Sequence, residues 1–256
     1  MFYTKSPILF AAVFATLVAA APARAADNPP ADHPSVKRPY SLPPSADLDY
    51  AIRARQHGFT LNGDATVNWR SGADTYSITS EARVPMFGVI LNNSSQGAVD
   101  GYGLAPATAS EKRFRKEPTT ITFKRDSHTI TFSESDQSYP IKGGEQDRTS
   151  AQWQLAAVAR GAPDKFTPGS EWAFFVAGRK DADPWVFKVV NKEDIGTGQG
   201  QVSALHLVKA PPPDGHKDQQ VDIWLAPSLG WYPVRIRFVD DDGDFVEQTL
   251  QKVTPK

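Results

Sequence analysis

The chain has 256 residues, with 28 basic and 29 acidic side chains, six tryptophans and no cysteine. The absence of cysteine excludes disulfides, thiolate metal sites, cysteine nucleophiles and a lipidated cysteine. The net charge of −1 gives no reason to expect nucleic acid or an anionic membrane surface as a partner. The proportion of apolar and aromatic residues is typical of a folded globular protein and not of a disordered one.

The first 25 residues have the pattern of a secretory signal peptide. Lys5 precedes an uncharged, mostly apolar run at residues 8–21, and residues 23–25 form an A-x-A cleavage site. The apolar run is shorter than the ~20 residues that a membrane-spanning helix needs. We therefore expect cleavage after Ala25, a periplasmic location and no transmembrane segment in the mature chain. Cleavage removes Lys5 and Arg24 and leaves a net charge of −3.

Residues 26–46 contain six prolines and few apolar side chains. This composition favours an extended, polyproline-like conformation and predicts a flexible tether. A spacer or a proline-rich docking peptide is the alternative interpretation. We expect a single β-rich domain to follow at residues 47–256.

From residue 47 onward, short segments alternate apolar and polar residues, the period-2 pattern of half-buried strands. Residues 48–54, 65–69 and 76–78 show it first, and residues 121–132 predict a hairpin. Turn-rich breaks separate the further predicted strands at 171–177, 185–192, 201–208, 221–225, 232–240 and 245–253. The spacing predicts a mainly β fold, an antiparallel meander that forms a barrel or half-barrel.

One helix is predicted at residues 149–160, a segment rich in alanine, leucine and glutamine. Asp147 or Thr149 is placed to cap its start, while Gly161 and Pro163 end it. Trp153 lies on the same helical face as two alanines and Arg160. We expect this helix to pack against or inside the barrel, with Trp153 buried against the sheet.

Several motifs resemble those of exported bacterial proteins catalogued as domain of unknown function 3108. They are GEQDR at 144–148, QWQLA at 152–156, DIWLAP at 222–227, YPVRIR at 232–237 and DGD at 242–244. The resemblance extends over residues 48–253 and implies no known reaction and no catalytic residues. The expected meander, with a helix in its concavity, is similar in architecture to periplasmic lipoprotein-carrier folds.

Motifs for catalysis or metal binding are missing from the sequence. The five histidines lack metal-ligand spacing, and no G-x-S-x-G nucleophile elbow is present. His206 lies in a predicted strand, where we expect a hydrogen-bonded structural role. The acidic run at 240–244 lacks the glycine and glutamate positions of a calcium loop and predicts a hairpin turn. We expect no metal and no cofactor.

Five residues are candidates for ligand contact. Asp147 and Arg148 precede the helix, where a helix cap and a salt-bridge partner account for them, and a place at the mouth of a cavity is the alternative. Trp224 and Trp231 lie at strand ends, where they close a barrel rim or line an apolar pocket. Trp153 on the helix completes the set.

The leading functional hypothesis is a non-catalytic periplasmic carrier or assembly factor for an apolar or amphiphilic envelope component. Export, a rolled sheet suited to enclosing a cavity, and abundant aromatic residues motivate it. Its partner is expected to be an apolar or amphiphilic small ligand or an envelope protein. A structural or protein-interaction module of the envelope is the first alternative, and an unrecognised envelope hydrolase is the second.

Overall fold

The computed structural model describes residues 33–56, 58–209 and 219–256. The predicted signal peptide, the first part of the predicted tether and the predicted break at 211–215 lie outside these ranges. Within the described residues, no helix is both long and apolar enough to cross a membrane.

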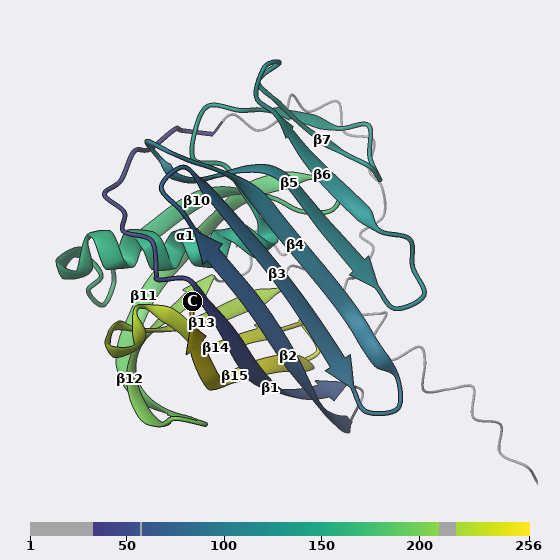
Figure 1. The fold of residues 1–256 in the computed structure, drawn as a ribbon, viewed down its shortest axis with the longest axis vertical. Helices are drawn as coiled ribbons and strands as arrows, with labels where there is room; N and C mark the ends of the chain where they lie inside the picture. The colour runs from purple at the N-terminus through teal and green to yellow at the C-terminus, as the bar shows by residue number, and fades with distance from the viewer. Residues whose placement is uncertain (1–32, 57, 210–218) are drawn as a thin grey trace, which may run out of the picture.

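The described strands form one continuous sheet that is folded into two facing layers (Figure 1). The first layer contains β1 (Ala46–Gln56), β2 (Phe59–Ser71), β3 (Thr75–Val84), β4 (Gly88–Asp100), β5 (Gly103–Arg113), β6 (Thr119–Lys124), β7 (Thr129–Phe132) and β8 (Ser138–Pro140). The second contains β9 (Gln146–Asp147), β10 (Glu171–Ala177), β11 (Ala182–Thr197), β12 (Gly200–Lys209), β13 (Gln220–Ala226), β14 (Tyr232–Val239) and β15 (Phe245–Pro255).

The sheet order is β8-β7-β6-β5-β4-β3-β2-β1-β15-β14-β13-β12-β11-β10-β9. Every pairing is antiparallel except the short parallel contact between β9 and β10. The pairing of β1 with β15 joins the layers, whereas the described β8 and β9 do not pair with each other. The fold is therefore an antiparallel meander that forms an open half-barrel, as the sequence predicts.

Side-chain alternation explains which face of the sheet is enclosed. In β1, Leu48, Tyr50 and Ile52 are buried, whereas Arg53 and Arg55 are exposed. Register shifts in several strand pairs, including that of β1 with β15, are irregularities that increase the local bend and twist of a sheet. Apolar side chains consequently gather on the concave side.

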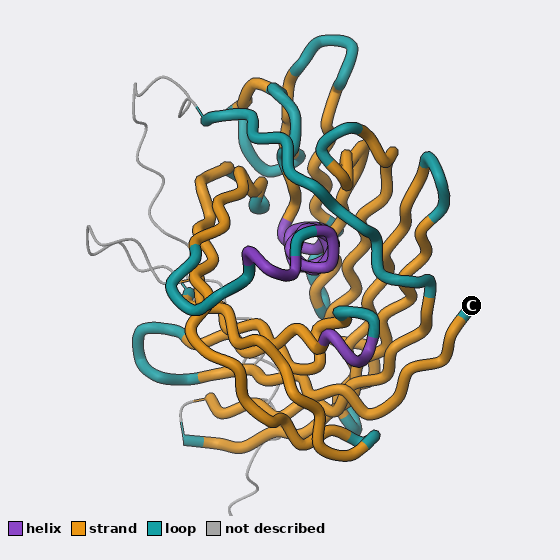
Figure 2. Tube along the Cα trace, turned by 90° about the vertical axis from the view of Figure 1, so that its left-hand side faces the viewer, coloured by secondary structure: helices purple, strands orange, loops and turns teal. Residues whose placement is uncertain are grey.

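The single described α-helix, α1 (Arg148–Gly161), lies inside this concavity and is surrounded by strands when viewed along its axis (Figure 2). It contacts β4, β5, β9, β10 and β14. Ser150, Ala151 and every residue from Trp153 to Ala159 are buried, which is typical of a helix that is enclosed on all sides. Its small alanine side chains allow the surrounding strands to approach closely.

Trp153 anchors the helix, as the sequence predicts. Its side chain is 1% exposed and stacks on Trp69 of β2, with ring centroids 4.5 Å apart. It also meets Tyr232 of β14 edge-on at 6.2 Å. Trp153 therefore joins both layers of the sheet to the helix.

Residues 33–45, here called the N-terminal strap, pack along the end of the barrel where α1 finishes. The Ser41 amide donates to the Ala157 carbonyl, and the Trp69 indole donates to the Pro43 carbonyl, both at 2.9 Å. A Cβ added to Gly161 would lie 2.5 Å from the Tyr40 Cα. The close approach of the strap to the end of α1 therefore requires glycine at this position. This described part of the predicted tether is therefore packed against the domain and covers one end of the half-barrel.

The lateral seam between the two sheet edges is filled by side chains. Phe123, Ile130 and Tyr139 of the first layer pack with Phe175 and Ala177 of the second. The buried His33 ring of the strap stacks on Phe175 at 3.8 Å. Side-chain packing, and not a backbone ladder, thus brings the edges together in the described structure.

Candidate functional site

A cavity of about 280 Å³ lies between the start of α1 and the concave face of the sheet. Ligand sites in proteins typically enclose about 300–1,000 Å³, so this volume is at the lower end of that range. The opposite end of the barrel is occupied by the end of α1 and the N-terminal strap. The cavity therefore opens toward the strand connections near the helix start.

The interior walls of the cavity are mostly aliphatic and aromatic. They come from strands of both layers and include Tyr50, Ile52, Val67, Ala82, Ile90, Leu91, Ile121, Phe187, Val221, Ile223, Ile236, Phe238 and Val246. The Tyr50 hydroxyl donates to the Pro233 carbonyl at 2.8 Å, so its polar atom is satisfied within the protein. Such walls favour an apolar ligand segment over water.

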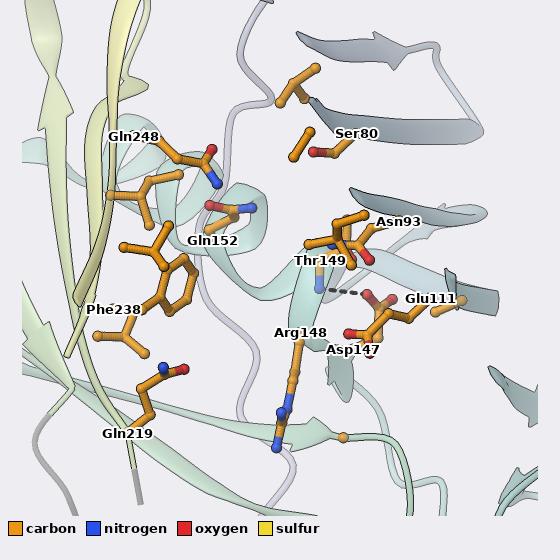
Figure 3. A pocket seen from close by; sticks show the side chains of 18 of the residues that line it. Ser80, Asn93, Glu111, Asp147, Arg148, Thr149, Gln152, Gln219, Phe238 and Gln248 are labelled. Atoms are coloured by element: carbon orange, nitrogen blue, oxygen red, sulfur yellow. Dashed lines mark hydrogen bonds between the residues drawn. The ribbon is translucent and has the colours of Figure 1, made fainter. Parts of the chain in front are cut away.

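Cationic side chains gather beside one aromatic wall of the cavity. Arg148 and Lys209 both approach Trp185 of β11, with the guanidinium carbon at 5.9 Å and the ammonium nitrogen at 4.9 Å from the ring centroid. Arg148 is exposed and extends from the helix start into the cavity, where Gln219 and Phe238 also lie (Figure 3). Lys209 is 3% exposed and donates to the Gln219 carbonyl at 3.4 Å, so of the two cations only Arg148 is exposed beside this aromatic wall.

An ion-pair network forms another part of the mouth. Arg113 pairs with Glu111 at 2.6 Å. Arg179, in the β10–β11 turn, pairs with Glu134 at 2.5 Å and approaches Glu111 at 3.7 Å. These contacts link the second layer to β5 and to the β7–β8 loop. The two arginines and two glutamates of this network largely neutralise one another.

Asp147 is the buried N-cap of α1. Its carboxylate accepts hydrogen bonds from the Thr149 and Ser150 amides at 2.8 and 2.9 Å and from the Ser95 hydroxyl. Burial is the largest influence on this carboxyl and raises the pKa of Asp147, while the hydrogen bonds oppose that shift. The position of Asp147 on the cavity wall is therefore compatible with a structural role as a cap (Figure 3).

One hydrogen-bond acceptor on the wall lacks a donor within the described protein. The buried Oδ1 of Asn93, on β4, accepts no hydrogen bond. Asn93 lines the cavity near Thr149 and Glu111 (Figure 3). Because a buried acceptor without a donor costs stability, a ligand hydroxyl or amide placed here would gain a hydrogen bond.

The structure brings three of the five candidate residues together at the cavity. Asp147, Arg148 and Trp153 line it, whereas Trp224 and Trp231 do not. Trp224 stacks on His206 and donates to Glu193 at 2.6 Å. Trp231 follows the short 3-10 helix η3 (Pro227–Leu229), at the end of the sheet opposite the mouth.

Trp185 and Lys209 are the functional candidates that sequence reasoning missed. Trp185 lies in a predicted strand and Lys209 directly follows another, so the alternation pattern places both near strand ends. The pattern does not reveal which strands become neighbours across the cavity. The available signals were a tryptophan directly after Asp183-Pro184 and a lysine just before the three prolines at 211–213.

His206 forms a separate polar cluster away from the cavity lining. Its Nε2 lies 2.7 Å from Asp222 Oδ1, and its Nδ1 lies 3.4 Å from Glu193 Oε1. These contacts and the stack on Trp224 agree with the predicted hydrogen-bonded structural role. Within the described ranges, no group of three or more His, Cys, Asp or Glu residues is arranged to hold a metal ion.

Comparison with known proteins identifies a family. The model for the protein of unknown function family DUF3108 matches residues 48–251, so the chain belongs to this family. No curated protein matches the chain.

Solved structures share the fold at low sequence identity. A beta-barrel-like protein of domain of unknown function DUF1849 from Brucella abortus is 11% identical, with a TM-score of 0.55 over 84% of this chain and 99% of that one. A protein from Parabacteroides distasonis, provisionally named a lipoprotein, has 10% identity and a TM-score of 0.36 over 86% and 100% of the two chains. A domain from Vibrio parahaemolyticus, provisionally named an outer membrane lipoprotein-sorting protein, has 8% identity and a TM-score of 0.31 over 83% and 86%. The first of these supports the beta-barrel-like fold alone.

Proposed function

For this member of the DUF3108 family, we propose a non-catalytic periplasmic carrier or assembly factor that binds an amphiphilic envelope component in the cavity. The observation that carries the proposal is the cavity itself, which has apolar walls and the exposed Arg148 beside Trp185. The signal-like first 25 residues support the periplasmic location.

The physical chemistry of the cavity favours a ligand with an acyl chain and a polar or anionic head. Each methylene group buried from water contributes ~0.8 kcal/mol, so a modest chain supplies useful affinity. The walls are preformed by strands of both layers, which limits the ordering cost of binding. The exposed Arg148 would attract the head and orient the ligand.

Displacement of an environment-sensitive fluorescent fatty acid tests this function. Ala82→Phe places a ring on the cavity wall and is expected to weaken binding at least ~tenfold, equivalent to about 1.4 kcal/mol. Ala51→Phe makes the same change at an exposed position of β1 and should leave affinity unchanged. Arg148→Ala should weaken a fatty acid more than the corresponding fatty alcohol, because only the acid carries a charge.

Two further results test where the ligand binds and whether the protein is a carrier or an interaction module. Trp224→Ala and Trp231→Ala, once confirmed to be folded, should bind like the parent because neither side chain lines the cavity. If neither fatty acids nor phospholipids bind below ~100 µM, equivalent to about 5.5 kcal/mol of binding free energy, the carrier proposal fails. The interaction-module alternative would then take its place.

A further inference from the structure

The strand connections at the mouth of the cavity form a distinct surface. Because successive strands are antiparallel, the β1–β2, β3–β4 and β5–β6 connections lie at the same end of the first layer (Figure 1). We call the exposed residues Arg55, Phe59, Arg83, Met86, Arg115 and Lys116 the tip surface. Ala82, Ile90 and Arg113, which flank these connections, line the cavity, so the tip surface adjoins its mouth.

The apolar members of the tip surface are the most exposed large hydrophobic residues of the described chain. Met86 is 101% exposed and Phe59 is 57% exposed. The other exposed large hydrophobic residues, Val36, Val186 and Val190, are at most 44% exposed. Met86 also has a φ of 71°, in the left-handed region that favours glycine or asparagine. This backbone conformation is unfavourable for methionine, and the fully exposed side chain gains no packing within the chain. Both observations indicate that Met86 contacts a partner.

Basic side chains surround these apolar tips. Arg55 is exposed near the end of β1, Arg115 and Lys116 are exposed in the β5–β6 connection, and Arg83 precedes the β3–β4 turn. Arg83 pairs with Glu81 at 2.6 Å, so part of its charge is compensated. The exposed Glu117 in the same β5–β6 connection offsets one of these charges, and the remaining basic side chains leave the first-layer tips with a positive excess.

Acidic residues define the boundary of this surface. The β14–β15 connection, next to the end of β1 through the pairing of Arg55 with Phe245, contains Asp240, Asp241, Asp242 and Asp244. Carboxylates are repelled by anionic lipid, whereas arginine and lysine beside exposed apolar side chains are attracted to it. Charge complementarity thus favours one orientation, with the first-layer tips toward an anionic surface.

We propose that the tip surface docks on an anionic phospholipid bilayer. Met86 and Phe59 enter the headgroup region, while Arg55, Arg115 and Lys116 lie against lipid phosphates. This orientation places the first-layer side of the cavity mouth next to the bilayer. The inference concerns the outer surface and does not depend on which ligand the cavity binds.

Because the chain has no cysteine, one introduced thiol can report contact at a chosen site. The mature protein with Met86→Cys, labelled with an environment-sensitive dye, should show a blue-shifted and brighter signal with vesicles of phosphatidylglycerol and phosphatidylethanolamine. Phosphatidylcholine vesicles should cause little change. The same label at Lys124→Cys, at the end of β6 and at the opposite end of the first layer, should not respond. Equal responses at both sites, or no response at Met86→Cys, would overturn the proposal.

Charge reversal supplies the matched control. Arg115→Glu with Lys116→Glu should reduce partitioning onto anionic vesicles at least about tenfold, because each basic residue near an anionic surface contributes about 1 kcal/mol. Lys124→Glu with Lys165→Glu makes the same net change at the other end and should have a smaller effect. Equal losses of vesicle partitioning in the two double variants would show that total charge alone causes the attraction. This result would overturn the assigned orientation. Fatty-acid displacement without vesicles should stay unchanged in Arg115→Glu with Lys116→Glu, which separates this proposal from the carrier function.

Discussion

Replacing Trp153 with alanine is expected to lower the free energy of unfolding by ~3–5 kcal/mol, the usual cost of deleting a large aromatic side chain from a core. The ring stacks on Trp69 and contacts Tyr232, so its loss weakens the attachment of α1 to both layers. At about 2–4 °C per kcal/mol for a domain of this size, the melting temperature should fall by roughly 6–20 °C.

Thermal and urea denaturation measure this effect. Met86→Ala is the control, because this large hydrophobic side chain is 101% exposed and its removal should change stability by less than about 0.5 kcal/mol. If Trp153→Ala shifted the melting temperature no more than the control, the helix would not be anchored as described.

Replacing Asp147 with alanine is expected to lower the free energy of unfolding by about 3–5 kcal/mol, since it removes a helix cap and leaves buried donors unsatisfied. The Ser95 and Ser150 side chains are fully buried, so water cannot substitute for the carboxylate. Asp147→Asn keeps an acceptor for the Thr149 and Ser150 amides and should be much less destabilising. Urea denaturation of both variants provides the comparison.

The same pair of proteins gives a pH prediction. Burial raises the pKa of Asp147, so the folded state binds this proton more tightly than the unfolded state does. The parent should therefore gain stability relative to Asp147→Asn as pH falls from above the raised pKa toward the unfolded value of about 3.9. A parent that instead lost stability relative to Asp147→Asn over this range would show that the hydrogen bonds outweigh burial.

Local sequence patterns predict those elements whose side chains alternate clearly. The predicted hairpin at residues 121–132 is present as β6 and β7, and the predicted helix at 149–160 extends by one residue at each end. In each case the apolar period or the cap is encoded within a short segment. Local sequence information is therefore sufficient to predict such elements.

Strands β4 and β5 were not predicted, and their composition explains why. They contain the polar run at 92–96, Gly97, Pro106 and several small residues, which have low strand propensity. Backbone pairing with neighbours on both sides holds β4 in place. A single segment does not reveal such long-range pairing.

The strap and the cavity also depend on long-range contacts. The proline-rich composition at 26–46 indicates an extended chain but not a surface on which it packs. Prolines keep their carbonyl acceptors, and Pro43 and Pro44 use theirs to bind the Trp69 indole and the Tyr232 hydroxyl. Likewise, alternation identifies Trp224 as a buried strand residue but does not tell which face of the sheet becomes concave.

Native mass spectrometry of the mature protein purified from the periplasm, combined with lipid extraction, tests the carrier function most directly. The proposed function predicts a co-purifying amphiphile with one acyl-containing molecule per protein, retained in Ala51→Phe and lost in Ala82→Phe. Protein that carries no amphiphile and also fails to take one up from added anionic lipid would contradict it.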